Sequence, residues 1–150
     1  MKRLTLALAC SAALFAALPA HAQFQKPEDA VKYRKAAFTL MANHFGRLSA
    51  MAQGKAPFDA ASAAANAELV ASLAKLPFTA FGEGTAVGDT AALPEVWSQN
   101  DKFKAAAAKL GEATTQLAAA GKSGNLDQIK AAVGETGKTC KACHDNFKKK

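Results

Sequence analysis

Apolar residues recur every three or four positions over most of the chain, and no stretch sustains the period-two alternation of a strand. The first such segment starts at Pro27 and ends at Gly54. Proline followed by two acidic residues favours a helix start, because proline suits the first turn and acids complement the helix dipole. Arg34 is the only charge on the predicted inward face, which carries Val31, Arg34, Phe38, Met41, Phe45, Leu48 and Ala52.

A second helix is predicted to begin after Asp59, a suitable N-cap, and to end before Pro77. Residues 77–97 then break the helical pattern, because glycines and prolines interrupt it repeatedly. This segment, PFTAFGEGTAVGDTAALPEVW, predicts a long crossing loop.

Two further helices follow the loop. Ser98 with Asp101 resembles a capping box, and Gly121 is expected to end that helix. Asn125 starts the last helix, whose apolar face reads Leu126, Ile129, Val133, Thr136, Cys140, Cys143 and Phe147. Four helices joined mostly by short connections pack antiparallel. The sequence therefore predicts an all-α fold, an up-down-up-down four-helix bundle, with both cysteines facing inward.

The N-terminal 22 residues read as a secretory signal peptide. Lys2 and Arg3 precede an apolar run, and Ala20-His21-Ala22 forms a small-x-small cleavage site. The run is too short for a membrane anchor, which needs about 20 apolar residues. We therefore expect cleavage after Ala22, an exported, periplasmic protein comprising one domain over residues 23–150, and no further membrane span.

Cleavage changes the charge and the cysteine count. It leaves 17 Lys and Arg against 12 Asp and Glu, a net charge of +5. The basic residues are not interleaved with aromatic ones, which excludes a nucleic-acid surface. The terminal lysines 148–150 are expected to form a solvated tail or a docking patch for an acidic partner. Cys140 and Cys143 are the only cysteines of the mature chain.

The segment TCKACHDNFKKK places Cys140, Cys143 and His144 in a Cys-x-x-Cys-His motif. In c-type cytochromes both thiols bond to haem and the adjacent histidine ligates the iron. A redox pair would sit at a helix N-terminus beside a βαβ unit, whereas this motif closes a helical chain. A zinc site would need a fourth ligand, and His44 is the one other histidine of the mature chain. The motif thus favours haem over the other two.

The sequence resembles cytochrome c prime, the class II c-type cytochromes, over essentially the whole mature chain. The most specific stretches are KPEDAVKYRKAAFTLMANHFGR, PEVW and TCKACHDNFKKK. The resemblance implies one haem c per chain, bonded through Cys140 and Cys143 and ligated by His144. Few residues follow the motif, so any sixth ligand must come from upstream.

The resemblance also implies that Phe38 lies over the open side of the iron, which is then five-coordinate. Arg34 on an apolar face costs free energy unless it is paired, and a haem propionate is a suitable partner. The alternative is that Arg34 extends to solvent at the bundle edge. Lys148 lies four residues after His144, where relatives often carry arginine, and is expected near the histidine.

A phenyl ring donates no hydrogen bond, so we expect binding of NO and CO and discrimination against dioxygen. The predicted role is NO buffering or transport, without enzymatic activity. The alternative is an electron-transfer cytochrome with an unknown redox partner, either with Met41 as the sixth ligand or with the five-coordinate haem unchanged. The resemblance further implies a homodimer through the first two helices, using a stripe of Ala30, Tyr33, Ala37, Leu40, His44 and Met51.

Overall fold

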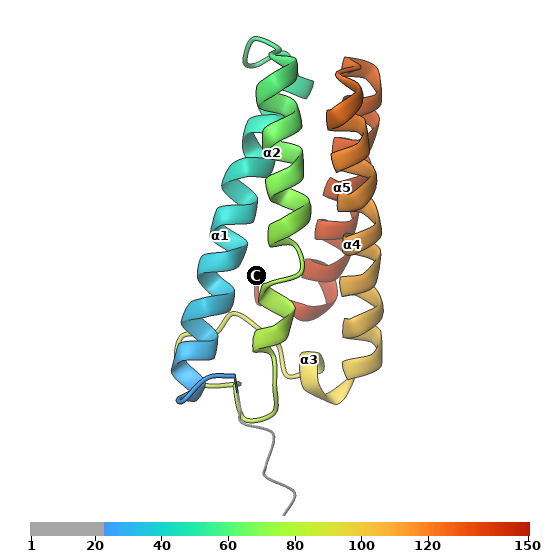
Figure 1. The fold of residues 1–150 in the computed structure, drawn as a ribbon. Coiled ribbons are helices and arrows are strands. Elements are labelled where there is room, and N and C mark those ends of the chain that lie inside the picture. The colour runs from blue at the N-terminus through green and yellow to red at the C-terminus, as the bar shows by residue number, and fades with distance from the viewer. Residues whose placement is uncertain (1–22) are drawn as a thin grey trace, which may run out of the picture.

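The computed structural model describes residues 23–150, and the predicted signal peptide lies outside the described residues. Four long helices form the fold (Figure 1): α1 (Pro27–Ala52), α2 (Ala60–Leu73), α4 (Asn100–Ser123) and α5 (Leu126–Phe147). Consecutive long helices run antiparallel, which confirms the predicted four-helix bundle. None of the described helices is long and apolar enough to cross a membrane.

Two of the three N-caps predicted from the sequence are present. The Asp59 carboxylate accepts a hydrogen bond of 2.7 Å from the Ser62 amide at the start of α2. The Asn125 side chain accepts bonds of 3.0 Å from the amides of Asp127 and Gln128 at the start of α5. Each cap satisfies amides that the first helical turn leaves without partners.

The crossing loop contains two short helices, the 3₁₀ turn η1 (Pro77–Ala80) and α3 (Glu95–Ser98). The predicted capping box at Ser98 is therefore wrong. Ser98 belongs to α3, and α4 follows a Gln99 cap that makes no side-chain hydrogen bond. The physical reason is Pro94, whose αR backbone starts a separate short helix before Ser98. Ser98 therefore ends that helix and does not cap the next one.

The predicted end of the third helix at Gly121 is also wrong. The helix α4 continues to Ser123 and ends at Gly124, whose φ of 66° is the left-handed conformation that favours glycine. Gly121 instead lies where α4 crosses α2. A Cβ atom there would stand 2.7 Å from the Cβ of Ala67, so only glycine permits this close approach.

The bundle contains two hydrophobic clusters. The larger joins the four long helices around Leu48, Val70, Leu117 and Ile129. The smaller, beneath the crossing loop, consists of Val96, Phe103 and Phe147. Helices α1 and α5 touch along a shorter stretch than the other neighbouring pairs. This looser pairing leaves room for a cavity between them.

Candidate cofactor-binding site

A cavity of about 560 Å³ lies within the bundle, bordered by α1, α5 and the crossing loop. This volume falls in the range of small-molecule and cofactor sites. Apolar side chains make up most of its wall. The cavity brings together all of the predicted site residues, which are Arg34, Phe38, Cys140, Cys143, His144 and Lys148.

The motif residues enter the cavity from α5. Cys140 and Cys143 are half-buried free thiols one helical turn apart. Burial raises the pKa of both thiols, and the neighbouring Cys140 contributes to the rise at Cys143. Both cysteines therefore lie on the inward face of α5, as their place on the apolar stripe predicted.

His144 lines the same cavity near the end of α5. Partial burial lowers the pKa of its imidazole, the Lys148 ammonium lowers it further, and Asp145 opposes both. Lys148 caps α5 in an extended conformation, and its amide donates to the His144 carbonyl at 3.2 Å. The surroundings thus favour the neutral imidazole, the form that binds metals.

Helix α1 supplies the opposite wall. Phe38 is half-buried and meets Phe78 edge to face, with ring centroids 5.8 Å apart. Met41, one turn further, also lines the cavity but is 92% buried and belongs to the main core cluster. Both side chains therefore stand on the cavity wall, as the stripe on α1 predicted.

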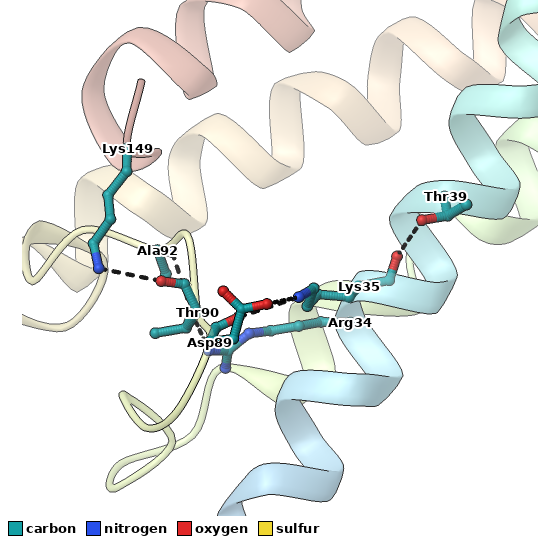
Figure 2. Close-up of polar contacts among 7 residues, drawn as sticks. All are labelled: Arg34, Lys35, Thr39, Asp89, Thr90, Ala92 and Lys149. Atoms are coloured by element: carbon teal, nitrogen blue, oxygen red, sulfur yellow. Dashed lines mark hydrogen bonds and ion pairs between the residues drawn. The ribbon is translucent and has the colours of Figure 1, made fainter.

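Arg34 is only 3% exposed, and its guanidinium bonds to the crossing loop (Figure 2). One terminal nitrogen donates to the Ala80 carbonyl at 2.9 Å and to the Thr85 hydroxyl at 3.0 Å. The other donates to the Thr85 carbonyl at 2.9 Å and to the Thr90 hydroxyl at 2.7 Å. These bonds use four of the five N–H donors of the side chain.

Arg34 therefore does not extend to solvent, and the loop supplies its hydrogen-bond partners. Its guanidinium also stacks 4.4 Å from the centroid of the Phe81 ring. Desolvation lowers the pKa of Arg34 from its usual value, as expected for a buried cation. Binding of Arg34 to a haem propionate stays a prediction. The Nε–H group is the one donor of this side chain that remains for such a bond.

The crossing loop lies between α1 and the end of the chain. Lys35 bonds Asp89 at 2.6 Å, and Lys149 reaches the Thr90 carbonyl at 3.2 Å from the other side (Figure 2). The Lys149 amide donates to the Ala91 carbonyl at 2.8 Å. Thr90, Ala91 and Ala92 line the cavity, so these bonds fix one part of its wall.

Sequence reasoning missed an aromatic cluster that covers this part of the cavity. Phe78 and Phe81 come from the loop, Phe103 from α4 and Phe147 from the end of α5, with centroids between 4.9 and 6.4 Å apart. The segment PFTAF carries two phenylalanines three residues apart, and this spacing is the sequence signal that could have suggested the aromatic cluster. These rings give the cavity an apolar wall suited to a flat aromatic cofactor.

The donor set also fits haem c. Two thiols one turn apart and an adjacent histidine share an apolar cavity, which is the chemistry of a covalently attached haem. Within residues 23–150, no three His, Cys, Asp or Glu side chains are grouped so that they could hold a bare metal ion.

The stripe predicted as a dimer surface is partly covered within the protomer. Ala30, Ala37 and Met51 are buried, whereas Leu40 is 52% exposed. The imidazole Nδ1 of His44 lies 2.8 Å from the side-chain oxygen of the buried Asn66, and so joins α1 to α2.

Comparison with known proteins agrees with this geometry. The family model for Cytochrome C' matches residues 29–148. The cytochrome c' of Rubrivivax gelatinosus is 64% identical over 129 residues, which are 85% of this chain and 100% of that protein. Its crystal structure covers the same shares with a TM-score of 0.83. A nitric oxide complex of a cytochrome c prime mutant from Alcaligenes xylosoxidans matches with a TM-score of 0.80 at 49% identity, over 85% and 99% of the two chains.

Most of the described chain, including the cysteine motif and the α1 wall, lies inside the matched residues. The family implies a c-type haem, in agreement with the cavity and its two cysteines. The chain belongs to the cytochrome c' family.

Proposed function

We propose that this protein is a periplasmic cytochrome that binds NO and CO at a five-coordinate haem and disfavours dioxygen. Its role would be NO buffering or transport, without catalysis. The observation that carries the proposal is that one cavity holds the Cys140 and Cys143 thiols and the His144 imidazole on α5, facing the apolar ring of Phe38 on α1.

Bound haem would supply an iron centre able to take a diatomic ligand. Cys140 and Cys143 would hold the group by thioether bonds, and His144 would ligate the iron. A phenyl ring has no donor atom for iron, so Phe38 would cover the opposite side without coordinating. A ligand must then displace this ring from its edge contact with Phe78.

Several hydrogen-bond donors in the cavity wall are already engaged, which supports discrimination against dioxygen. The Arg34 terminal nitrogens donate to the crossing loop. The Thr114 hydroxyl donates to the Gly111 carbonyl at 3.1 Å, and that of Thr136 points to the Ala113 carbonyl at 3.5 Å. Bound dioxygen gains from a free donor, whereas NO and CO bind well without one.

The solved nitric oxide complex of a mutant of a 49% identical relative supports NO as a ligand of this protein.

We also propose a homodimer through α1 and α2, because Leu40 and Leu69 on these helices are large apolar side chains exposed by 52% and 43%. A sizing column run of the mature protein tests it, and elution as a single chain would contradict it.

The six-coordinate form of the electron-carrier alternative requires Met41 to reach the iron. Its side chain lines the cavity, but it is also packed in the main core cluster. Bringing Met41 to the iron would break these contacts and leave its place in the core empty. Emptying a core site in this way costs about 2 kcal/mol or more. This packing favours the five-coordinate site.

The test is the rate of CO association with the ferrous protein, compared with Phe38→Ala. The edge-to-face contact of Phe38 with Phe78 is worth about 0.5 to 1.5 kcal/mol, so its loss should accelerate binding by up to about tenfold. Phe45→Ala is the matched control, because Phe45 is also half-buried on the α1 wall but lies two turns from Phe38. Equal rates in the wild type and in Phe38→Ala would contradict a ligand site under this ring.

A further inference from the structure

A second hollow lies outside the haem cavity, between α4 and α5, with a volume of about 540 Å³. These two helices pack side by side along most of their lengths (Figure 1). We call this hollow the α4–α5 groove and define it by Lys102, Lys109, Lys138, Glu135, Cys143 and Phe147. The proposed gas binding uses none of its lysines.

The groove and the haem cavity share part of one wall. Cys143 and Phe147 line both hollows, so a group bonded to the Cys143 sulfur would lie directly behind the groove. The covalent edge of a haem attached at Cys143 would therefore lie close to the protein surface on this side.

The groove carries an excess of positive charge. Lys102 and Lys109 form no ion pair within residues 23–150, and Lys102 donates only to the neutral Gln99 side chain at 2.9 Å. Lys138 pairs with Glu135 at 3.2 Å, the one carboxylate of the groove. Three ammonium groups therefore face one carboxylate, and a patch of one sign attracts a partner of the opposite sign.

We propose that the α4–α5 groove docks an acidic redox protein that exchanges one electron with the haem through the wall at Cys143. The partner loses one electron, the ferric iron gains it, and no bond or proton moves. This inference rests on the proposed attachment of haem at Cys143. It adds to that function an entry point for electrons and the chemical class of the partner.

The test compares two double variants of the mature haem protein. Lys102→Glu/Lys109→Glu reverses the free charges of the groove. Lys55→Glu/Lys75→Glu makes the same change in net charge at exposed lysines outside the groove. The probe is reduced flavodoxin, an acidic one-electron protein, mixed with the ferric protein in a stopped-flow instrument at low salt.

We expect the groove variant to react at least about tenfold more slowly at low salt than the control variant, because steering changes association rates by 10-fold or more. The difference should vanish near 0.5 M salt, where the Debye length is only a few ångströms. Equal slowing of both variants, or a difference that persists at high salt, would overturn the proposal.

A second readout does not depend on electron transfer. In the diamagnetic ferrous CO complex, hexacyanochromate(III), a paramagnetic trianion, should broaden the amide signals of Ala105 and Ala142 in the groove, with diamagnetic hexacyanocobaltate(III) as the blank. Broadening confined to other surfaces would overturn the proposal, as would broadening here without any effect of the charge reversal on the flavodoxin rate. A protein that lacks the haem spectrum altogether would refute the proposed function instead, so the two failures are distinguishable.

Discussion

Arg34 links α1 to a loop about 50 residues later in the chain, so replacing it tests how the cavity wall is held. The substitution Arg34→Met keeps an unbranched apolar stem and removes all four hydrogen bonds to Ala80, Thr85 and Thr90. The backbone carbonyls of Ala80 and Thr85 then lose the charged guanidinium that donates to them, within a largely buried region.

The magnitude follows from those two carbonyls. A buried acceptor left without a partner costs about 1 to 3 kcal/mol. Thr85 is only half-buried, so water can reach its carbonyl and the lower half of the range applies there. Part of the loss is recovered because a buried cation is no longer desolvated. We therefore expect Arg34→Met to lower the free energy of unfolding by about 3 kcal/mol.

Lys35→Met is the matched control. Lys35 holds the same loop through Asp89, but the side chains of this ion pair are 54% and 96% exposed. Exposed pairs contribute less than about 1 kcal/mol, so this variant should lose no more than that. Denaturant unfolding of the haem protein measures both values.

Amide hydrogen exchange then locates the effect. The Leu93 amide donates to the Phe147 carbonyl at 3.0 Å, and the Lys149 amide to Ala91. Both should exchange faster in Arg34→Met than in Lys35→Met, because the loop is freed from α1. Equal stability losses in the two variants, or unchanged exchange at these amides, would refute the role assigned to Arg34.

Three other predictions concern packing, pH and ligation. Gly121→Ala should lower the free energy of unfolding by about 1 to 3 kcal/mol, because the new Cβ would overlap with Ala67. Gly134→Ala has open space around its Cβ and should raise the free energy of unfolding by up to about 1 kcal/mol. Denaturant unfolding measures both, and equal effects would contradict the close approach at Gly121. The hydrogen bond from Lys35 lowers the pKa of the Asp89 carboxyl, so its contribution to stability is present above about pH 4 and disappears as pH falls through the folded pKa. Asp89→Asn should therefore be less stable than the wild type at pH 6, by a difference that shrinks as pH falls below about 4, and a constant difference would refute this. Met41→Leu should leave the ferric and ferrous absorption spectra unchanged, and loss of a low-spin component would show ligation.

The sequence was sufficient for the features that depend on local patterns. The bounds of α1, the caps at Asp59 and Asn125, and the inward position of Cys140 and Cys143 follow from helical spacing and capping chemistry within a few residues of each feature.

Features that depend on long-range contacts could not be predicted in this way. Two glycines stand near the end of α4, and which of them ends the helix is decided by the close crossing with α2 at Gly121. The partners of Arg34 lie about 50 residues away in an irregular loop, and periodicity says nothing about how such a loop folds back. The aromatic cover from Phe78 and Phe81 depends on that same fold-back.

The most direct test of the five-coordinate site is the visible absorption spectrum of the mature protein. It is recorded in the ferric and ferrous states, before and after addition of CO, NO and air. The account predicts high-spin bands in both states, clear shifts with CO and NO, and no stable dioxygen complex of the ferrous protein in air. A low-spin spectrum that CO leaves unchanged would contradict it, because a side chain such as Met41 would then occupy the position assigned to the open side beneath Phe38.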